Sequence, residues 1–517
     1  MFASDESGLL RPTLLVLFAL AIYYYVYLSY LPRRRLKARG ISLPPGPKQK
    51  WLIGNLHQLA AAKTEPWLTF ASWGKIYGPL VYLRVLNKET IIINSGKAAI
   101  ELLESRSGVT SDRPTQWMGG ELAGRKYSVF LTSSTDPRFR FFRRLLHNGL
   151  NPRASKDYRP IQLQENRVLL QNLAQSPQNL ALHIRRNAVA TILKVAYGYE
   201  VKSNDDPLVH LLEHGFKLAA GISVPGKYWV EFFPILRYIP SWFPGAGFKR
   251  QARLVGREMS GIETTPFKWA KKQIESGDFI ESFTSKHILE GGKELDQSAL
   301  DDIKWCAAAL YVGGGDTTVS AMLTFFLIMS LHPEIQRRAQ RDVDAVASDR
   351  LPTYEDFENL PYIRALIKEV LRWGTVAPLG IPHKAMEPDI YENYFIPKDA
   401  NITANIWAIT HDDEIYPDPD VFDPERHLGN PEERQPDPFK FIFGFGRRVC
   451  PGAHLAEMAL FLNISSILAA FDISKAVDER GVPIEPNIEW STGATRHLKP
   501  FPCQITLRSK DRLALFE

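Results

Sequence analysis

Phe443-Gly-Phe-Gly-Arg-Arg-Val-Cys450-Pro-Gly452 is the most informative segment of the sequence. It places a cysteine after a glycine-rich bend and before a predicted helix that begins near Cys450. Glycines let a backbone approach something flat, and amides at a helix start can donate to a thiolate and lower its basicity. A soft thiolate in this position is a natural ligand for iron. A buried structural cysteine is the usual alternative, but the spacing of Phe443, Gly446, Arg448, Cys450 and Gly452 favours a ligand.

The other cysteines, Cys306 and Cys503, show no pattern of their own. Three cysteines in a chain of 517 residues argue against a disulfide framework and favour a reducing compartment. Zinc is an alternative at Cys450, because His454 follows it by four residues. No other pair of cysteines or histidines completes such a site.

A long helix is predicted upstream, with glycines at its centre. Residues 300–331 contain no proline, and as a helix they would extend about 45 Å. Gly313-Gly-Gly-Asp316-Thr317-Thr lies at the middle, where each glycine costs up to about 1 kcal/mol relative to alanine. We interpret these glycines as a helix face pressed by a flat ligand, with one turn opened to admit a small molecule. Asp316 and Thr317 then offer an acid and a hydroxyl that relay protons; a kinked core helix with a polar patch is the alternative.

Charged residues between these two segments suggest a structural network. Glu369 and Arg372 are three residues apart and share a helix face. Phe422-Asp-Pro-Glu-Arg426 adds a second arginine from a proline-fixed loop. A buried network of Glu369, Arg372 and Arg426 would lock the loop that carries the cysteine, whereas most such pairs are only solvated surface contacts.

Two further segments carry basic groups. Phe139-Arg-Phe-Phe-Arg143-Arg144 is a basic, aromatic helix segment, and His383 lies in the extended Ile381-Pro-His-Lys384. Both are either ordinary surface or partners for the carboxylates of a cofactor.

Residues 14–31, LLVLFALAIYYYVYLSYL, carry no charge. As a helix they would reach about 27 Å, enough to span a bilayer. The run is too long for a typical signal-peptide core, and its tyrosines suit a membrane interface. The basic residues that follow place the rest of the chain in the cytosol by the positive-inside rule; they are Arg33, Arg34, Arg35, Lys37 and Arg39. We therefore predict a transmembrane signal anchor over residues 1–32, with a cleaved secretory signal as the alternative.

The rest of the chain is predicted to be one large catalytic domain, residues 48–517, after a basic and proline-rich hinge over residues 33–47. Leu43-Pro-Pro-Gly-Pro47 makes this hinge semi-rigid. No repeat or low-complexity linker divides the domain. The chain is 45% hydrophobic and 23% charged, which excludes wholesale disorder and collagen-like folds. Its net charge of +6 is spread over the chain without the dense basic blocks of a nucleic-acid binder.

The predicted fold class is mainly α with a small β portion. Strands are expected over 80–85, 90–94 and 401–407. Helices are expected from about residue 96 to 373 and again from about 452 to 470.

Together these motifs resemble the haem-thiolate monooxygenases of the cytochrome P-450 superfamily. The resemblance covers essentially the whole chain in the family's order, from the anchor through the glycine-acid-threonine helix and Glu-x-x-Arg to the cysteine loop. Three segments are similar to microsomal enzymes of basidiomycete secondary metabolism, including the tryptamine-hydroxylase type; they are Ser223 to Trp229, Gly313 to Met322 and Ile381 to Lys384.

The resemblance implies the P-450 fold and a role for each motif. Cys450 would be the proximal thiolate ligand of the iron of haem b, in a loop with Phe443, Gly446 and Gly452. Arg143, His383 and Arg448 would pair with the haem propionates, and Glu369, Arg372 and Arg426 would form the structural triad. Thr317 and Asp316 would deliver protons. Two departures stand out: Phe139 replaces the usual tryptophan, which puts one propionate hydrogen bond in doubt, and His427 replaces the usual aromatic residue after Pro-Glu-Arg.

The implied activity inserts one atom of dioxygen into a substrate C–H bond and releases the other as water. The chain shows no flavin or NADPH fingerprint. The resemblance therefore implies a separate NADPH-cytochrome reductase in the endoplasmic reticulum membrane, with cytochrome b5 as a further candidate donor. Positive charge for docking would come from Arg140, Arg144, Lys440 and Arg447.

The resemblance also places a substrate pocket, and its side chains are mainly apolar: Trp117, Met118, Trp305, Ala309, Val376, Leu379 and Thr495. No acidic residue is expected to clamp an amine there, since Asp316 belongs to the proton relay. A hydrophobic substrate of terpenoid, polycyclic aromatic or steroid type is therefore favoured over an indole amine.

Two other functions use the same centre. One is a reductase-independent peroxygenase or isomerase, against which the acid-threonine pair argues, and the other is a non-catalytic haem sensor. Replacing Thr317 by alanine distinguishes them, because only the monooxygenase would consume reductant without forming product.

Overall fold

The computed structural model describes residues 36, 38–61, 65–203, 205–222, 226–292, 295–430, 432 and 434–516. The transmembrane anchor predicted over residues 1–32 lies outside these ranges, as do residues 33–35 and 37 of the predicted hinge. Residues 223–225, at the start of one of the motifs, lie outside them as well.

Helices make up most of the described chain and the sheets are small, which confirms the predicted fold class. The α-helices are α2 (Leu56–Ala61), α3 (Pro66–Tyr77), α4 (Gly96–Ala99), α5 (Ser107–Thr110), α6 (Pro137–Leu150), α7 (Arg159–Gln175), α8 (Leu180–Tyr197), α9 (Pro207–Ile222), α10 (Gly247–Ser276), α11 (Phe283–Gly291), α12 (Gln297–Leu331), α13 (Pro333–Val346), α14 (Pro361–Gly374), α15 (Ile406–Thr410), α16 (Phe439–Ile442) and α17 (Ala453–Ala470). The strands are β1 (Leu80–Val85), β2 (Lys88–Ile93), β3 (His383–Lys384), β4 (Asp389–Tyr391), β5 (Tyr394–Ile396), β6 (Asn401–Ala404), β7 (Phe471–Lys475) and β8 (Cys503–Leu507). Four short helical segments matter below: η1 (Ile100–Ser105), η2 (Trp117–Leu122), η9 (Pro424–His427) and η10 (Gly446–Arg448).

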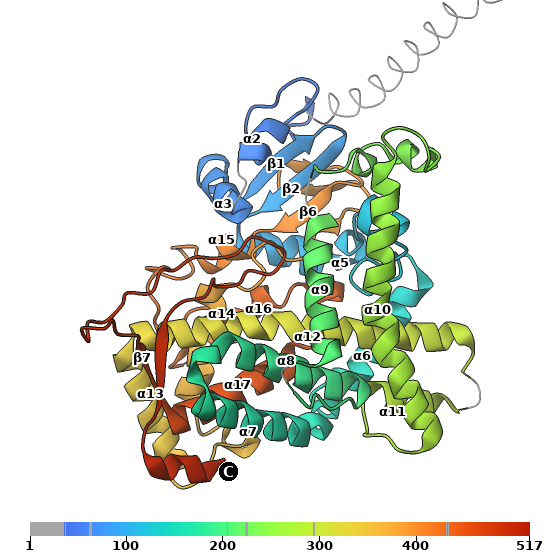
Figure 1. Ribbon diagram of the computed structural model, residues 1–517. Helices are drawn as coiled ribbons and strands as arrows, with labels where there is room; N and C mark the ends of the chain where they lie inside the picture. The colour runs from blue at the N-terminus through green and yellow to red at the C-terminus, as the bar shows by residue number, and fades with distance from the viewer. Residues whose placement is uncertain are drawn as a thin grey trace, which may run out of the picture.

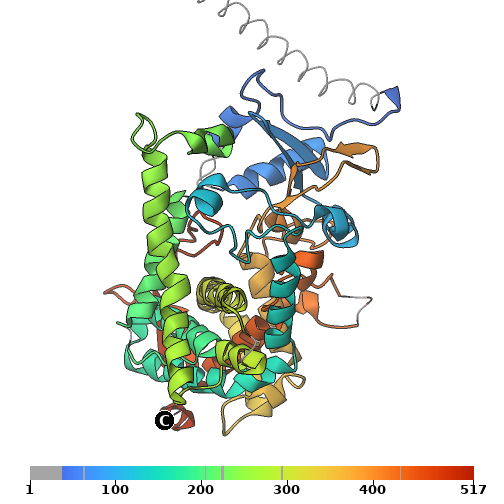
Figure 2. The ribbon, with the colours of Figure 1, turned by 90° about the vertical axis from the view of Figure 1, so that its right-hand side faces the viewer.

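The central element is α12, which crosses the molecule from side to side in Figure 1 and is seen end-on, with other helices around it, in Figure 2. It begins after Asp296, whose side chain accepts a hydrogen bond from the backbone N–H of Ala299 at 2.8 Å. It ends just before Pro333, which has no N–H with which to continue the helix. Every side chain from Val319 to Ser330 is buried, so this half of the helix belongs to the core.

The neighbours of α12 are α8, α10, α14 and α17, among others. Among the described residues, α12 and α17 are long and apolar enough to cross a membrane, but most of each apolar stretch is buried inside the protein. Helices that are apolar all round and covered by other helices are core helices.

A four-stranded sheet in the order β1-β2-β6-β3 lies above α12 in Figure 1. The hairpin β1–β2 is antiparallel, β2 and β6 are parallel, and β6 and β3 are antiparallel. The first strand has the predicted bounds, whereas β2 begins at Lys88, two residues earlier than predicted.

The strand predicted over residues 401–407 is wrong in its second half. The strand β6 ends at Ala404, and the helix α15 starts at Ile406. Asn405 makes the change, because its side chain accepts a hydrogen bond from the N–H of Ala408 at 3.3 Å. Such an N-cap satisfies a helix-terminal donor and favours a helix over continued pairing. The hairpin β7–β8 was not predicted at all, because its strands are 27 residues apart.

Candidate functional site

The cysteine loop connects α16 to α17. The backbone N–H of Cys450 donates to the carbonyl of Phe443 at 2.7 Å, which closes the bend. Gly446 has a φ of 51°, and a Cβ there would lie 2.6 Å from the carbonyl oxygen of Leu103 in η1. Glycine is therefore required at this position by both backbone conformation and close packing. We expected the glycines of this loop to let it approach a flat ligand, and at Gly446 the close approach that the structure shows is to η1.

The Cys450 side chain is exposed, yet burial raises the pKa of its thiol. The two observations agree if the sulfur lines a recess enclosed by protein rather than the outer surface. The backbone amide of Gly452 and the charge of Arg143 act in the opposite direction and favour the thiolate. We expected backbone amides to lower the pKa of this thiol. The amide of Gly452 acts in that direction, but burial has the larger effect and the pKa is raised.

Arg143, on α6, holds the cysteine loop in place. Its Nη1 donates to the carbonyl of Val449 at 2.8 Å. The helix α6 begins at Pro137. Asp136 is its N-cap, and its side chain accepts a hydrogen bond from the backbone N–H of Arg138. Arg143 is therefore positioned directly beside Cys450.

Arg448 and Arg113 form a cationic cluster, and His383 lies beside it. Arg448 donates to the carbonyls of Ser111 and Thr132 at 2.8 and 2.7 Å, and Arg113 donates to those of Ile381 and Pro382 at 2.6 and 2.8 Å. His383, in β3, lies 2.9 Å from the carbonyl oxygen of Thr110.

The charges in this cluster are poorly compensated. Burial, followed by repulsion from Arg448, lowers the pKa of Arg113 to about 9. Burial and the charge of Arg113 lower the pKa of His383 to about 3, so this imidazole is neutral at physiological pH. The nearby acid is Asp112, whose carboxylate already accepts from Lys384 at 2.8 Å and from Ser133 at 2.6 Å.

Phe139, which stands where the family usually has tryptophan, packs against the cationic cluster. It is buried, and the guanidinium of Arg448 lies 4.1 Å from the centre of its ring. The phenyl ring thus gives up an N–H donor but provides a cation–π contact that holds Arg448 in place.

The glycines of α12 have a different explanation from the predicted one. The helix is continuous through Gly313, Gly314 and Gly315, without the opened turn that we expected. A Cβ on Gly314 would lie 2.8 Å from Ile192 of α8, and one on Gly315 would lie 2.7 Å from Leu212 of α9. Only Gly313 has room, with Phe130 at 3.8 Å. Close helix packing therefore accounts for two of the three glycines.

Thr317 and Asp316 make distinct contacts. The hydroxyl of Thr317 donates to the carbonyl of Gly313 at 2.8 Å. Asp316 is paired with His497, from the C-terminal loop, with an Nε2-to-carboxylate distance of 3.1 Å. Both side chains of this pair are about one-fifth exposed. Sequence reasoning missed His497, because it is 181 residues away and belongs to no motif.

The predicted Glu-Arg-Arg network is present and fully buried. Arg372 donates through Nε and Nη2 to both oxygens of Glu369, each at 2.8 Å, and also to the carbonyls of Thr410 and Pro419. The Nε of Arg426 lies 3.5 Å from Glu369. His427 adds a fourth member, with its Nε2 2.9 Å from the same carboxylate. The change from the usual aromatic residue thus ties η9 more closely to α14.

A small cavity lies against α12 near Trp305 and Ala309, two of the predicted pocket residues. Other predicted pocket residues pack elsewhere. Met118 is completely buried in a core cluster, Leu379 packs on Phe70 and its neighbours, and Trp117 lies under the guanidinium of Arg237. Val376 and Thr495 are partly buried, and neither borders this cavity.

Glu263, on α10, is an acidic residue that borders the cavity, and its carboxylate is already paired with Arg125. It was missed because α10 has no motif to mark it. A zinc site at Cys450 finds no support, since the described ranges contain no cluster of three potential metal-binding side chains.

The family model described as Cytochrome P450 matches residues 44–500. The chain belongs to the cytochrome P450 family. It is 40% identical to "Cytochrome P450 monooxygenase claR" of Ampulloclitocybe clavipes over 94% of this chain and 89% of the relative. It is 40% identical to "Cytochrome P450 monooxygenase 208" of Postia placenta, over 95% and 94%, and 38% identical to "Cytochrome P450 monooxygenase ppsD" of Aspergillus oryzae, over 97% and 96%.

This cytochrome P450 is a haem-thiolate monooxygenase, similar to enzymes of fungi. The family implies haem as the cofactor and a redox partner as the source of electrons.

The residues of the site fit a haem. The Cys450 sulfur is a soft ligand for iron. The Nε of Arg113 is buried and has no hydrogen-bond partner in the described parts of the chain, and buried cations need an anionic partner. The two carboxylates of haem would supply that partner for Arg113 and Arg448. Arg113 was not among the residues predicted to bind carboxylates, because it stands in a loop without a regular pattern.

Proposed function

We propose that this chain is a membrane-anchored monooxygenase that inserts one oxygen atom from dioxygen into a hydrophobic small molecule in secondary metabolism. Electrons would come from NADPH through a separate NADPH-cytochrome reductase, with cytochrome b5 as an additional donor. The substrate class is terpenoid, polycyclic aromatic or steroid-like. The observation that carries the proposal is the Cys450 thiol beside Arg143, next to the buried cationic cluster of Arg113 and Arg448.

Each residue of the site has a part in this function. Cys450 would hold the iron of haem b, while Arg113, Arg143, Arg448 and His383 would hold the propionates. When bound, the haem supplies the redox chemistry that activates dioxygen. Phe443, Gly446 and Gly452 shape the loop that presents the thiol.

Proton delivery would use two neighbouring residues on α12. Thr317 holds its hydroxyl proton on the carbonyl oxygen of Gly313 and can pass it towards the reaction centre when a proton arrives from solvent. Asp316 and His497 supply that proton, because both are partly exposed and are hydrogen-bonded to each other. Glu369, Arg372, Arg426 and His427 would act only as a structural support for the cysteine loop.

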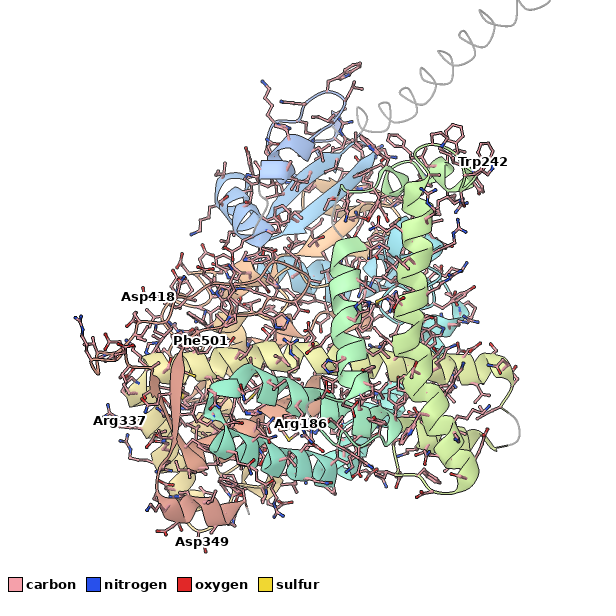
Figure 3. All side chains as sticks on the ribbon, viewed as in Figure 1. Arg186, Trp242, Arg337, Asp349, Asp418 and Phe501 are labelled. Carbon is pink, nitrogen blue, oxygen red and sulfur yellow. The ribbon has the colours of Figure 1, made fainter. Side chains whose placement is uncertain are left out.

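In this proposal residues 1–32 anchor the chain in the endoplasmic reticulum membrane and residues 33–47 form a hinge. Residues 48–517 are the catalytic domain, which faces the cytosol. Exposed aromatic side chains on the body support it. Trp51 and Trp242 are 85% and 79% exposed. The segment that carries Trp242 lies at the same end of the molecule as the first described residues (Figure 3). The side chain of Asn87 joins the β1–β2 turn to this segment through the carbonyl of Phe232, at 2.7 Å. Tryptophan at this end suits a membrane interface.

The test is a product assay. Microsomes containing the chain and a reductase are given terpenoids, polycyclic aromatics, steroids and indole amines, and the products are analysed by mass. We expect one added oxygen that depends on NADPH and is lost in Cys450→Ala. The proposal is wrong if the Cys450→Ala variant keeps the activity or if the purified protein binds no haem.

A further inference from the structure

A single buried carboxylate, that of Asp112, joins three segments around the cationic cluster. Asp112 is only 4% exposed. Its Oδ1 accepts hydrogen bonds from the hydroxyl of Ser133 at 2.6 Å and from the backbone N–H of Ser134 at 2.9 Å. Its Oδ2 lies 2.8 Å from the Nζ of Lys384 in β3. This side chain therefore fastens three parts of the chain to one another: the segment between α5 and η2, the loop before α6 and the strand β3.

Arg448 spans two of these segments. It donates to the carbonyls of Ser111 and Thr132 at 2.8 and 2.7 Å. These carbonyls belong to the residues directly before Asp112 and Ser133. The hydrogen bond between Asp112 and Ser133 therefore sets the spacing of the two acceptors that hold the Arg448 guanidinium.

The contact with β3 has the same effect on Arg113 and His383. The backbone N–H of Lys384 donates to the carbonyl of Asp112 at 2.9 Å, alongside the contact between their side chains. Arg113 donates to the carbonyls of the two residues before His383 at 2.6 and 2.8 Å. His383 itself lies 2.9 Å from the carbonyl oxygen of Thr110. All these contacts need β3 in one register beside the segment, and the pair of Asp112 and Lys384 holds it there.

The charge of Asp112 opposes the binding of other carboxylates. Burial would raise the pKa of Asp112, but hydrogen bonds from Lys384 and Ser133 outweigh it and lower the pKa, so the carboxylate is ionised at neutral pH. Burial lowers the pKa of Arg113 and of Arg448, and the charge of Asp112 acts against this change. The same charge repels an incoming carboxylate. Charge alone would therefore weaken the binding of propionates, and the fastening contacts of Asp112 are what favours it.

We propose that Asp112 is a positioning residue for haem. By fastening the three segments it directs the side chains of Arg113, Arg448 and His383 to the place where they receive the propionates. The inference rests on the proposed role of these three residues and adds the residue that holds them together. Asp112 acts through them rather than on the cofactor itself.

The surroundings of Asp112 allow it to be replaced. Asp112, Arg113, Ser133 and Lys384 border a polar cleft of about 270 Å³, which has room for several water molecules. Water from this cleft can solvate Lys384 and Ser133 once the carboxylate is removed. We therefore expect variants at Asp112 to fold, with the fastening lost but without a buried polar group left unpaired.

The rate of haem loss tests the proposal. Full-length protein in detergent is mixed with excess apomyoglobin, and the transfer of haem is followed by absorbance without any need for turnover. We expect Asp112→Ala to speed haem loss by about 10- to 100-fold, the range for hydrogen bonds to charged groups. Asp112→Asn keeps an acceptor for Ser133 and Ser134 but loses the charge that pairs with Lys384, so its effect should be smaller. Slower haem loss in both variants would show that Asp112 acts only by repelling the propionates, and would overturn the inference.

A variant without a change of charge isolates the fastening. Ser133→Ala removes one donor to Asp112 and should speed haem loss a few-fold. In the Asp112→Ala background it should add little, because the contact is already lost. The inference is overturned if Ser133→Ala alone has no effect, a result that does not depend on the folding of Asp112→Ala.

A spectroscopic readout separates positioning from a general loss of structure. The propionate bending bands of the resonance Raman spectrum report the hydrogen bonds that the propionates accept, and they should shift in Asp112→Ala and Asp112→Asn. Faster haem loss with unshifted bands would show a merely structural role and overturn the inference.

Asp356→Ala is the matched control. Asp356 lies between α13 and α14 and is also 4% exposed. Its carboxylate likewise accepts from a cation, Arg350, and from the hydroxyl and the backbone N–H of Thr353. Its replacement should change neither the rate of haem loss nor the bands. Failure of the proposed function is seen separately, as a protein that binds no haem at all or that binds haem without forming an oxygenated product.

Discussion

At the scale of single residues, Thr317 and its neighbour Thr318 differ in what their hydroxyls do. The Thr317 hydroxyl donates to Gly313, whereas that of Thr318 makes no hydrogen bond within the described chain. We predict that Thr317→Ala lowers the product formed per NADPH consumed by about 10-fold or more, within the range for a lost proton-transfer group. Thr318→Ala is the matched control and should keep the coupling. Product and hydrogen peroxide are measured against NADPH in the same reaction.

Replacing His497 tests whether it takes part in proton delivery or only holds the structure together. His497→Ala leaves Asp316 without its donor, so coupling should fall less than in Thr317→Ala while haem binding stays intact. Coupling that is unchanged in both Thr317→Ala and His497→Ala would contradict a relay through these residues. The motif points to Asp316 and Thr317 as the relay that we propose. It could not point to His497 or Arg113, because chain folding alone brings each of them beside residues of the motifs.

At the scale of elements, the three glycines of α12 can be distinguished by alanine substitution. We predict that Gly314→Ala destabilises the protein by about 1–3 kcal/mol, since its Cβ would overlap Ile192 at 2.8 Å. Gly313→Ala should be neutral or stabilising by up to about 1 kcal/mol, because its Cβ meets only Phe130 at 3.8 Å and alanine favours helix. Thermal unfolding of the haem-loaded variants gives both values. Equal destabilisation by the two changes would refute the packing explanation.

The network at α14 and η9 makes stability depend on pH. Burial alone would raise the pKa of Glu369, but hydrogen bonds from Arg372 and His427 outweigh it and hold the pKa at about 2. A carboxyl with a lowered folded-state pKa stabilises the fold above its unfolded-state pKa, and this contribution is lost as the pH falls towards the folded-state value. The contribution of Glu369 is therefore complete above about pH 5 and decreases between about pH 5 and 2.

We predict that Glu369→Gln costs about 3–5 kcal/mol at neutral pH, because it breaks a buried pair. It should also flatten the decrease of unfolding free energy between about pH 5 and 3, measured by urea titration. Glu358→Gln is the control. That carboxylate pairs with Arg364 at 2.6 Å but is 76% exposed, so its loss should have little effect. A pH profile of Glu369→Gln parallel to that of the unmodified chain would contradict the assignment.

The elements themselves were predicted where periodicity is long or a motif marks them. The helix expected over 300–331 and the one ending near residue 470 are present as α12 and α17. The errors have two causes, and neither leaves a periodic signal. Asn405 ends β6 by a local contact, the cap of α15. Ile192 and Leu212 explain two glycines by tertiary packing against α12, rather than by a ligand.

At the scale of the whole molecule, the charge around the cysteine loop bears on the reductase docking that we propose. Arg140 and Arg144 on α6, Lys440 on α16 and Arg447 on η10 are all exposed. Arg143, between the first two, donates to the loop itself. These cations surround the side of the protein on which Cys450 lies, so an acidic patch on a reductase would be steered to the haem ligand.

We predict that the double variant Arg140→Glu/Arg144→Glu raises the KM for the reductase at least 10-fold at low salt. Two charge reversals make part of the docking surface repel an acidic partner, and rim charges act mainly on association rate and salt dependence. For the unmodified chain, the reductase-driven rate should fall as ionic strength rises, because salt screens exposed charges. The double variant should lose most of this dependence. The control is Lys268→Glu/Lys272→Glu, an exposed pair with the same spacing on α10, which changes net charge equally and should keep the KM. If both double variants raise the KM alike, net charge rather than a docking site at the cysteine loop governs the encounter.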